Sequence, residues 1–143
     1  MTHKELIIDT GYFIALFSKK DQFHKKALGL RFSIDNRKWI TTWPVLTEVC
    51  HLLTNRAAGN LIVPLLQFHE KGGFEIFSVA ETHLPKMITL LEKYEKLPMD
   101  LADASLVLLA EELGHGDIVS TDKRDFNTYR WKDHKPFHNL FAV

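Results

Sequence analysis

The sequence predicts an α/β fold, in which a parallel β-sheet carries helices on both faces. Short segments of strand character alternate along the chain with longer helical segments, and this order is typical of βαβ units. The first strand, residues 6–8, is an uninterrupted apolar run, as expected of a strand that is buried on both faces. No long linker, internal repeat or low-complexity tract interrupts the 143 residues. We therefore expect a single domain over residues 1–143.

The first half of the chain supplies two strands and four helices. After the strand at residues 6–8, the apolar stretch 12–18 predicts a helix. Residues 23–36 predict a second helix, because one buried stripe joins Phe23, Ala27, Leu30 and Ile34. A short strand is expected over residues 39–42. Pro44 then suits the first turn of a helix that fades near Gly59, and a further short helix is expected over residues 61–69.

The second half is predicted in the same way. Residues 74–79 alternate enough to form a strand, and residues 84–96 form a helix that Pro98 closes. Residues 100–113 are apolar almost all round, which indicates a buried helix. Gly114 and Gly116 end this helix. Strands are expected over residues 117–121 and 137–141.

Composition excludes several classes of protein. The formal net charge is zero, which argues against a protein that coats nucleic acid by bulk charge. Basic pairs either flank an acidic centre or lie on solvated helix faces: Lys19-Lys20, Lys25-Lys26, Arg37-Lys38 and Lys123-Arg124. No apolar run approaches the roughly 20 residues that span a bilayer. The lone Cys50 forms no internal disulfide and the first residues show no secretory signal, so we expect a cytoplasmic protein with no membrane contact.

Two strands end in an aspartate. Asp9 follows residues 6–8, and Asp122 follows the similar run 118–121. In open α/β sheets, ligands bind at the carboxyl ends of the strands. These two acids therefore suggest one shared acidic site.

Two further acids lie close to apolar helix faces. Glu48 is at the edge of the apolar arc of its helix, and Asp103 is in the first turn of the nearly all-apolar helix. A buried carboxylate is costly unless it is paired or bound to a metal, and a divalent cation would relieve the repulsion among four converging acids. Mg²⁺ and Mn²⁺ prefer oxygen ligands. Such sites promote in-line attack of metal-activated water on a phosphodiester.

Each acid also has a structural interpretation. Asp9 would cap the helix that follows it, and Asp103 would be a first-turn acid that the helix dipole favours. Glu48 would reach solvent, and Asp122 or Asp125 would be turn acids. Asp100 is the better N-cap of the pair Asp100 and Asp103. The eight histidines show no HxH or HExxH spacing, so we expect them to be scattered surface or core residues and not a zinc site.

Four segments occur in a recognisable order: residues 7–10, Thr47-Glu48-Val49, residues 103–106 and residues 121–126. Together they resemble the PIN-domain ribonucleases, the fold of the VapC-type toxins of bacterial toxin–antitoxin pairs. The resemblance implies a three-layer α/β/α fold with about five parallel strands. It also implies an endoribonuclease that depends on Mg²⁺ or Mn²⁺ and hydrolyses RNA phosphodiester bonds.

The resemblance assigns catalytic roles to Asp9, Glu48, Asp103 and Asp122. Asp9, Asp103 and Asp122 would also hold the metal, with Asp125 as an additional ligand and Asp100 as the alternative third acid. Thr10 and Thr121 match positions where a hydroxyl supports the site.

The resemblance also implies partners. It implies an antitoxin that docks on the early helices, and a homodimer. Several apolar residues either line a groove for such a partner or pack in the core: Phe13, Leu16, Phe17, Phe23, Phe32, Leu65 and Phe68. The alternative to an enzyme is a catalytically inert RNA-binding or scaffold protein on the same fold.

Overall fold

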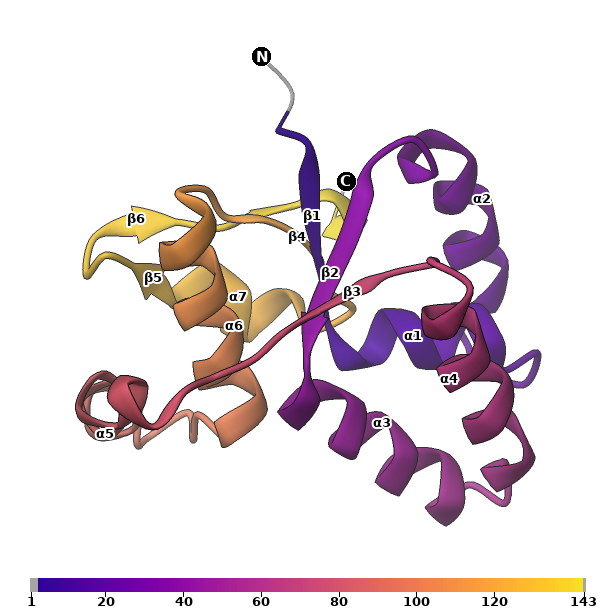
Figure 1. Ribbon diagram of the computed structural model, residues 1–143, viewed down its shortest axis with the longest axis horizontal. Coiled ribbons are helices and arrows are strands. Elements are labelled where there is room, and N and C mark those ends of the chain that lie inside the picture. Colours follow the sequence, from indigo (N-terminus) through magenta and orange to yellow (C-terminus); the bar gives the residue numbers. More distant parts are fainter. Residues whose placement is uncertain (1–2, 143) are drawn as a thin grey trace.

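The computed structural model describes residues 3–142 and contains one five-stranded parallel sheet (Figure 1). The strand order is β3-β2-β1-β4-β7. The strands are β1 (Glu5–Ile8), β2 (Lys38–Thr42), β3 (Glu75–Phe77), β4 (Asp117–Val119) and β7 (His138–Asn139). All four pairings within this sheet are parallel, so the predicted α/β architecture is confirmed.

Strand β1 is the centre of the sheet. Leu6 pairs with Trp39 of β2 on one side, and Ile7 pairs with Ile118 of β4 on the other. The last three residues of β1 are fully buried, which is what its uninterrupted apolar run predicts. The strand therefore delivers Asp9, the next residue, to the carboxyl edge of the sheet between two neighbours.

Within residues 3–142, seven α-helices pack around the sheet. They are α1 (Thr10–Phe17), α2 (His24–Ile34), α3 (Trp43–Asn55), α4 (Ile62–Glu70), α5 (Leu84–Lys93), α6 (Leu101–Leu113) and α7 (Lys123–Thr128). In Figure 1, α1, α2 and α4 lie on one side of the central strands, and α5, α6 and α7 lie on the other. The α6 helix packs against β1 and β2 and is buried over most of its surface, as its apolar sequence predicts. Gly114 ends it in the left-handed conformation, with φ of 79°.

The C-terminal part departs from the prediction. Residues 130–136 form a hairpin that we did not expect, β5 (Arg130–Trp131) with β6 (Lys135–Pro136). Lys132 and Asp133 make its turn possible, because both have positive φ. A last strand was expected over residues 137–141, but only the two residues of β7 form it. After β7 the chain turns into a 3₁₀ helix, Leu140–Ala142, and the Asn139 side chain accepts a hydrogen bond from the Phe141 N–H (3.1 Å).

Other boundaries shift by a few residues. The strand expected over residues 74–79 is the shorter β3, and the helix expected over residues 84–96 ends at Lys93. Short 3₁₀ turns, Gly59–Leu61 and Glu81–His83, precede α4 and α5. These changes lie away from the carboxyl ends of β1 and β4. At those ends, the strand expected over residues 117–121 stops at Val119, and the helix expected over residues 12–18 begins at Thr10.

Candidate active site

A cavity of about 290 Å³ opens at the carboxyl ends of β1 and β4. All eight residues that the sequence singles out for the site line it: Asp9, Thr10, Glu48, Asp100, Asp103, Thr121, Asp122 and Asp125. Asp21 adds a seventh carboxylate, and Arg56 is the one basic residue of the lining. The structure therefore gathers acids from five separate parts of the chain around one hollow.

Asp9 is the deepest of these acids, with 6% of its surface exposed. Its Oδ1 accepts a hydrogen bond from the Thr10 N–H (2.7 Å), and its Oδ2 accepts one from the Ser120 hydroxyl (2.6 Å). Burial raises the pKa of Asp9 to about 6, although the bond from Ser120 works in the opposite direction. Asp9 thus caps α1, as its structural interpretation predicts, and also presents a carboxylate to the cavity.

Ser120 and Asn139 hold Asp9 in place, and neither was predicted. The Asn139 side chain of β7 accepts from the Ser120 N–H (3.0 Å) and donates to the Ser120 carbonyl (2.9 Å). The Ser120 hydroxyl also accepts from the Asp122 N–H (3.0 Å). The last strand is therefore part of the support of the site. Ser120 falls inside the strand expected from the sequence over residues 117–121, whereas β4 ends at Val119 and leaves Ser120 just past it; nothing local distinguished Asn139.

Asp103 lies opposite, in the first turn of α6. Burial, together with the nearby carboxylates of Asp100 and Asp9, raises its pKa to about 8. The Tyr129 hydroxyl donates a hydrogen bond to Asp103 Oδ2 (2.8 Å). Tyr129 is fully buried, and burial together with Asp103 raises its own pKa. The sequence showed Tyr129 only as one aromatic residue in a polar stretch.

Asp100 has a different place from Asp103. Its Oδ1 accepts from the Asp103 N–H (2.8 Å), so it is the N-cap of α6, as predicted. Asp100 is exposed at the mouth of the cavity, whereas Asp103 is half-buried. Both carboxylates therefore line the hollow, Asp103 from the more enclosed position.

Glu48 reaches the cavity from α3. The Thr42 hydroxyl caps this helix and hydrogen-bonds to the Ser105 hydroxyl of α6 (2.6 Å), which fixes the two helix starts together. Burial, together with the nearby Asp100 carboxyl, raises the pKa of Glu48 to about 7. The Thr10 hydroxyl lies near enough to lower this pKa, yet its buried Oγ1 has no partner in hydrogen-bond geometry.

Asp122 and Asp125 complete the wall. Asp122 Oδ1 accepts from the Asp125 N–H (3.1 Å) and caps α7, so these acids do border a turn. Desolvation raises the pKa of Asp122, and the Asp125 carboxyl raises it further. Asp125 is buried and pairs with the exposed Arg124 at 3.2 Å.

Gly11 allows the two strand ends to meet. A Cβ atom at this position would collide with Thr121 Oγ1. The first turn of α1 and the loop after β4 can therefore approach each other closely only because residue 11 has no side chain.

The donor set fits a hard divalent cation. It consists of carboxylate oxygens and hydroxyls, and the orphaned Thr10 Oγ1 is a further oxygen without a partner. Among the described residues, no three of these carboxylates bring their oxygens within 4.8 Å of one another. At this spacing an ion would contact one or two of the carboxylates directly and reach the others through its bound waters, several of which Mg²⁺ usually keeps.

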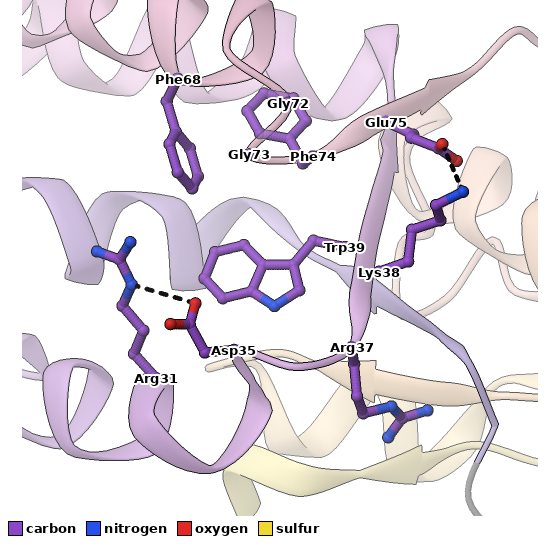
Figure 2. A pocket seen from close by; sticks show the side chains of 10 residues that line it. All are labelled: Arg31, Asp35, Arg37, Lys38, Trp39, Phe68, Gly72, Gly73, Phe74 and Glu75. Atoms are coloured by element: carbon purple, nitrogen blue, oxygen red, sulfur yellow. Dashed lines mark ion pairs between the residues drawn. The ribbon is translucent and has the colours of Figure 1, made fainter.

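Another hollow, of about 280 Å³, lies at the amino ends of β2 and β3 (Figure 2). Its charged residues are already paired: Lys38 with Glu75 at 2.9 Å, and Arg31 with Asp35 at 3.8 Å. Arg37 points away from the Trp39 indole in Figure 2. We therefore place the candidate site at the acidic cavity.

The histidines are less scattered than we expected. His3, His115 and Asp117 bring potential ligand atoms within 4.8 Å of one another at the amino ends of β1 and β4. Residues far apart in sequence form this group, so no spacing rule could reveal it. Two of its potential ligand atoms have protein partners, because the Asp117 N–H donates to His115 Nδ1 (3.2 Å) and Arg37 pairs with the Asp117 carboxylate (2.9 Å), whereas the buried His115 Nε2 has no hydrogen-bond partner within residues 3–142.

Comparisons with known proteins agree with this geometry. The family model described as PIN domain matches residues 6–132. The chain is 22% identical to Ribonuclease VapC26 of Mycobacterium tuberculosis (strain ATCC 25618 / H37Rv) over 125 residues, which cover 87% of this chain and 92% of the relative. The crystal structure of Mycobacterium tuberculosis VapC20, a toxin that cleaves the sarcin–ricin loop, superposes with a TM-score of 0.77.

That superposition covers 92% of this chain and 99% of the other, at 18% identity. It establishes the shared fold, and so confirms the predicted three-layer architecture with five parallel strands. No helix within residues 3–142 has the length and apolar character needed to cross a membrane.

Proposed function

The chain belongs to the PIN-domain family, and from that premise we propose that it is an endoribonuclease that hydrolyses RNA phosphodiester bonds with Mg²⁺ or Mn²⁺. One observation carries the proposal: Asp9, Glu48, Asp103 and Asp122 line a single cavity in which burial raises the pKa of each. A site that gathers this much negative charge at a structural cost is suited to a bound cation.

The acids would have different tasks. Asp9, Asp103 and Asp122 would hold the cation, with Asp125 and the more exposed Asp100 as further oxygen donors. When bound, a divalent ion supplies positive charge that activates a water molecule and neutralises the phosphodiester. Ser120 and Tyr129 would fix the orientation of Asp9 and Asp103 through the hydrogen bonds described above.

Glu48 is suited to proton transfer. Its pKa of about 7 lies near the working pH, where a general base is most effective. We assign its carboxylate the role of accepting the proton from the attacking water. The hydroxyls of Thr10 and Thr121, which line the same cavity, would support the water or the phosphate.

The wider role is that of the toxin of a toxin–antitoxin pair, acting in the cytoplasm as a homodimer. The similarity to Ribonuclease VapC26 and to the VapC20 toxin supports the toxin role, and the location and the homodimer remain part of the proposal. The apolar residues considered for an antitoxin groove contribute little, since Phe13, Leu16 and Leu65 are buried in the core and only Phe32 is widely exposed, at 89%.

The test is cleavage of a mixed pool of structured RNA by pure protein with Mg²⁺, Mn²⁺ or EDTA. Asp9→Asn and Asp103→Asn keep the side-chain shape and remove the charge, and Glu112→Gln is the control because it removes an exposed carboxylate from the same helix as Asp103. We expect metal-dependent cleavage in the wild type and the control and none in the two site variants.

Three outcomes would contradict the proposal. RNA binding without cleavage under either metal would favour the catalytically inert RNA-binding alternative. Cleavage that continues in EDTA would show that the reaction does not need a divalent cation. Cleavage that is lost in Asp9→Asn but kept in Asp103→Asn would show that Asp100, and not Asp103, is the third acid of the site.

A further inference from the structure

The acidic cavity continues into a second hollow on each of two sides. On one side it shares Asp21 and Arg56 with a hollow of about 390 Å³. On the other side it shares Glu48 and Asp100 with an open groove of about 610 Å³. We call these the basic hollow and the indole groove. Because each shares lining residues with the acidic cavity, both hollows adjoin it, and we call the three together the track.

The indole groove begins where α3 and α6 begin. Trp43 is the first residue of α3 and Leu101 the first residue of α6, and they are 52% and 57% exposed. The two helix starts are tied together by the Thr42–Ser105 hydrogen bond (2.6 Å). The groove therefore has a fixed apolar floor directly beside the acids.

Trp43 differs from the other tryptophans of the chain. Trp39 and Trp131 are 3% and 6% exposed and belong to the core. An exposed indole offers a flat aromatic face, and unpaired nucleobases stack on such faces. A phosphate would be repelled here, because Glu48 and Asp100 also line the groove.

The basic hollow has the opposite character. Lys19 and Lys20 are exposed in the turn after α1, and Arg56 adds a third cation at the rim, where it pairs with Asp21 at 3.0 Å. This placement favours the first of the two interpretations of Lys19-Lys20, a basic pair that flanks an acidic centre. Lysine and arginine side chains attract the phosphates of nucleic acids.

Resting on the proposed function, we infer that Trp43 and the pair Lys19-Lys20 bind the RNA on either side of the acids: the base of one nucleotide flanking the cleaved bond stacks on Trp43, and Lys19 and Lys20 hold a phosphate on the other side. Only an unpaired base can present its face to the indole, since paired bases are stacked inside the duplex. The track would therefore select loops and single strands over duplex RNA.

The test measures RNA binding by the cleavage-inactive Asp9→Asn protein. The probes are single-stranded oligonucleotides in which an abasic nucleotide replaces each position in turn. An abasic nucleotide at one position should weaken binding by about 5- to 150-fold, the range for one base stacked on an aromatic side chain. Trp43→Ala should weaken the intact oligonucleotide by a similar factor. The two changes combined should cost no more than either alone, because both remove the same contact.

One control variant and one further test separate the base-stacking contact from the phosphate contact. Phe32→Ala removes an exposed aromatic residue of α2 that lines neither the cavity nor the two hollows, so binding should not change. Lys19→Ala with Lys20→Ala should weaken all sequences alike and reduce the salt dependence of binding, by a slope of about 1 for each lost phosphate contact.

If the losses of affinity caused by Trp43→Ala and by the abasic nucleotide multiply in full when combined, the two changes act independently and the proposed stacking contact is wrong. An equal affinity for a duplex of the same sequence would overturn that contact as well. A change of oligomeric state in Trp43→Ala, seen by light scattering, would assign the groove to a second copy of the chain. If the wild type cuts RNA but Trp43→Ala binds and cuts like the wild type, this inference fails alone; if the wild type neither binds nor cuts RNA, the proposed function fails as well.

Discussion

Replacing Asp103 with asparagine should make the metal-free protein more stable at neutral pH. Burial raises the pKa of this carboxyl from 3.8 to about 8. The folded protein therefore keeps a proton that the unfolded chain releases as the pH rises between these two values. Folding stability falls over that window, because the folded state binds more protons than the unfolded state does.

The size of the effect follows from the same pKa. From 3.8 to pH 7 is about 3 units, and each unit corresponds to about 1.36 kcal/mol, so the upper limit is about 4 kcal/mol. Water in the open cavity reduces this penalty, and we expect about 2–3 kcal/mol. Asparagine is neutral throughout, and its side-chain oxygen can still accept the hydrogen bond from Tyr129.

The assay is urea unfolding of the wild type and Asp103→Asn in EDTA at about pH 4.5 and pH 7. The two proteins should be close in stability at the lower pH, and the variant should be the more stable at the higher pH. Mg²⁺ or Mn²⁺ should narrow the difference, since an ion bound only by the folded wild type stabilises it.

Glu112→Gln is the matched control, because Glu112 is an exposed residue of the same helix, and it should behave as the wild type at both pH values. A difference between the wild type and Asp103→Asn that does not change with pH would refute the reasoning. So would a wild type that is the more stable of the two at pH 7 without metal.

Three further substitutions test the support of the site. Ser120→Ala removes the hydroxyl that lowers the pKa of Asp9; in the metal-free protein this pKa should rise above about 6 by about 1 unit, as followed by NMR titration of the Asp9 carboxyl and as expected for losing a hydrogen bond to a charged group. An unchanged Asp9 titration would contradict this. Gly11→Ala should lower the melting temperature and cleavage together, since its Cβ would collide with Thr121; unchanged values of both would show that the loop yields freely. Asn139→Ala removes three hydrogen bonds and should lower the free energy of unfolding by about 2–3 kcal/mol in urea unfolding, whereas a loss below about 0.5 kcal/mol would mean that water replaces the amide.

Sequence reasoning located the acids because their signals are local. Asp9 follows an apolar strand, and Asp103 starts an apolar helix behind its cap Asp100. It also placed most elements to within a few residues. It failed at residues 130–136, where two residues with positive φ turn the chain into a hairpin. Asp133 is a residue type that tolerates positive φ, but Lys132 is not, and no glycine marks the turn.

The sequence by itself determined the α/β class and the set of acids, since strand periodicity, helix caps and the cost of a carboxylate near apolar residues all act over a few neighbouring positions. The tertiary structure decided how those acids are held. Ser120 bonds to Asp9 across 111 residues, and Tyr129 bonds to Asp103 across 26. Such contacts depend on which strands lie side by side in the sheet, and no local pattern records that order.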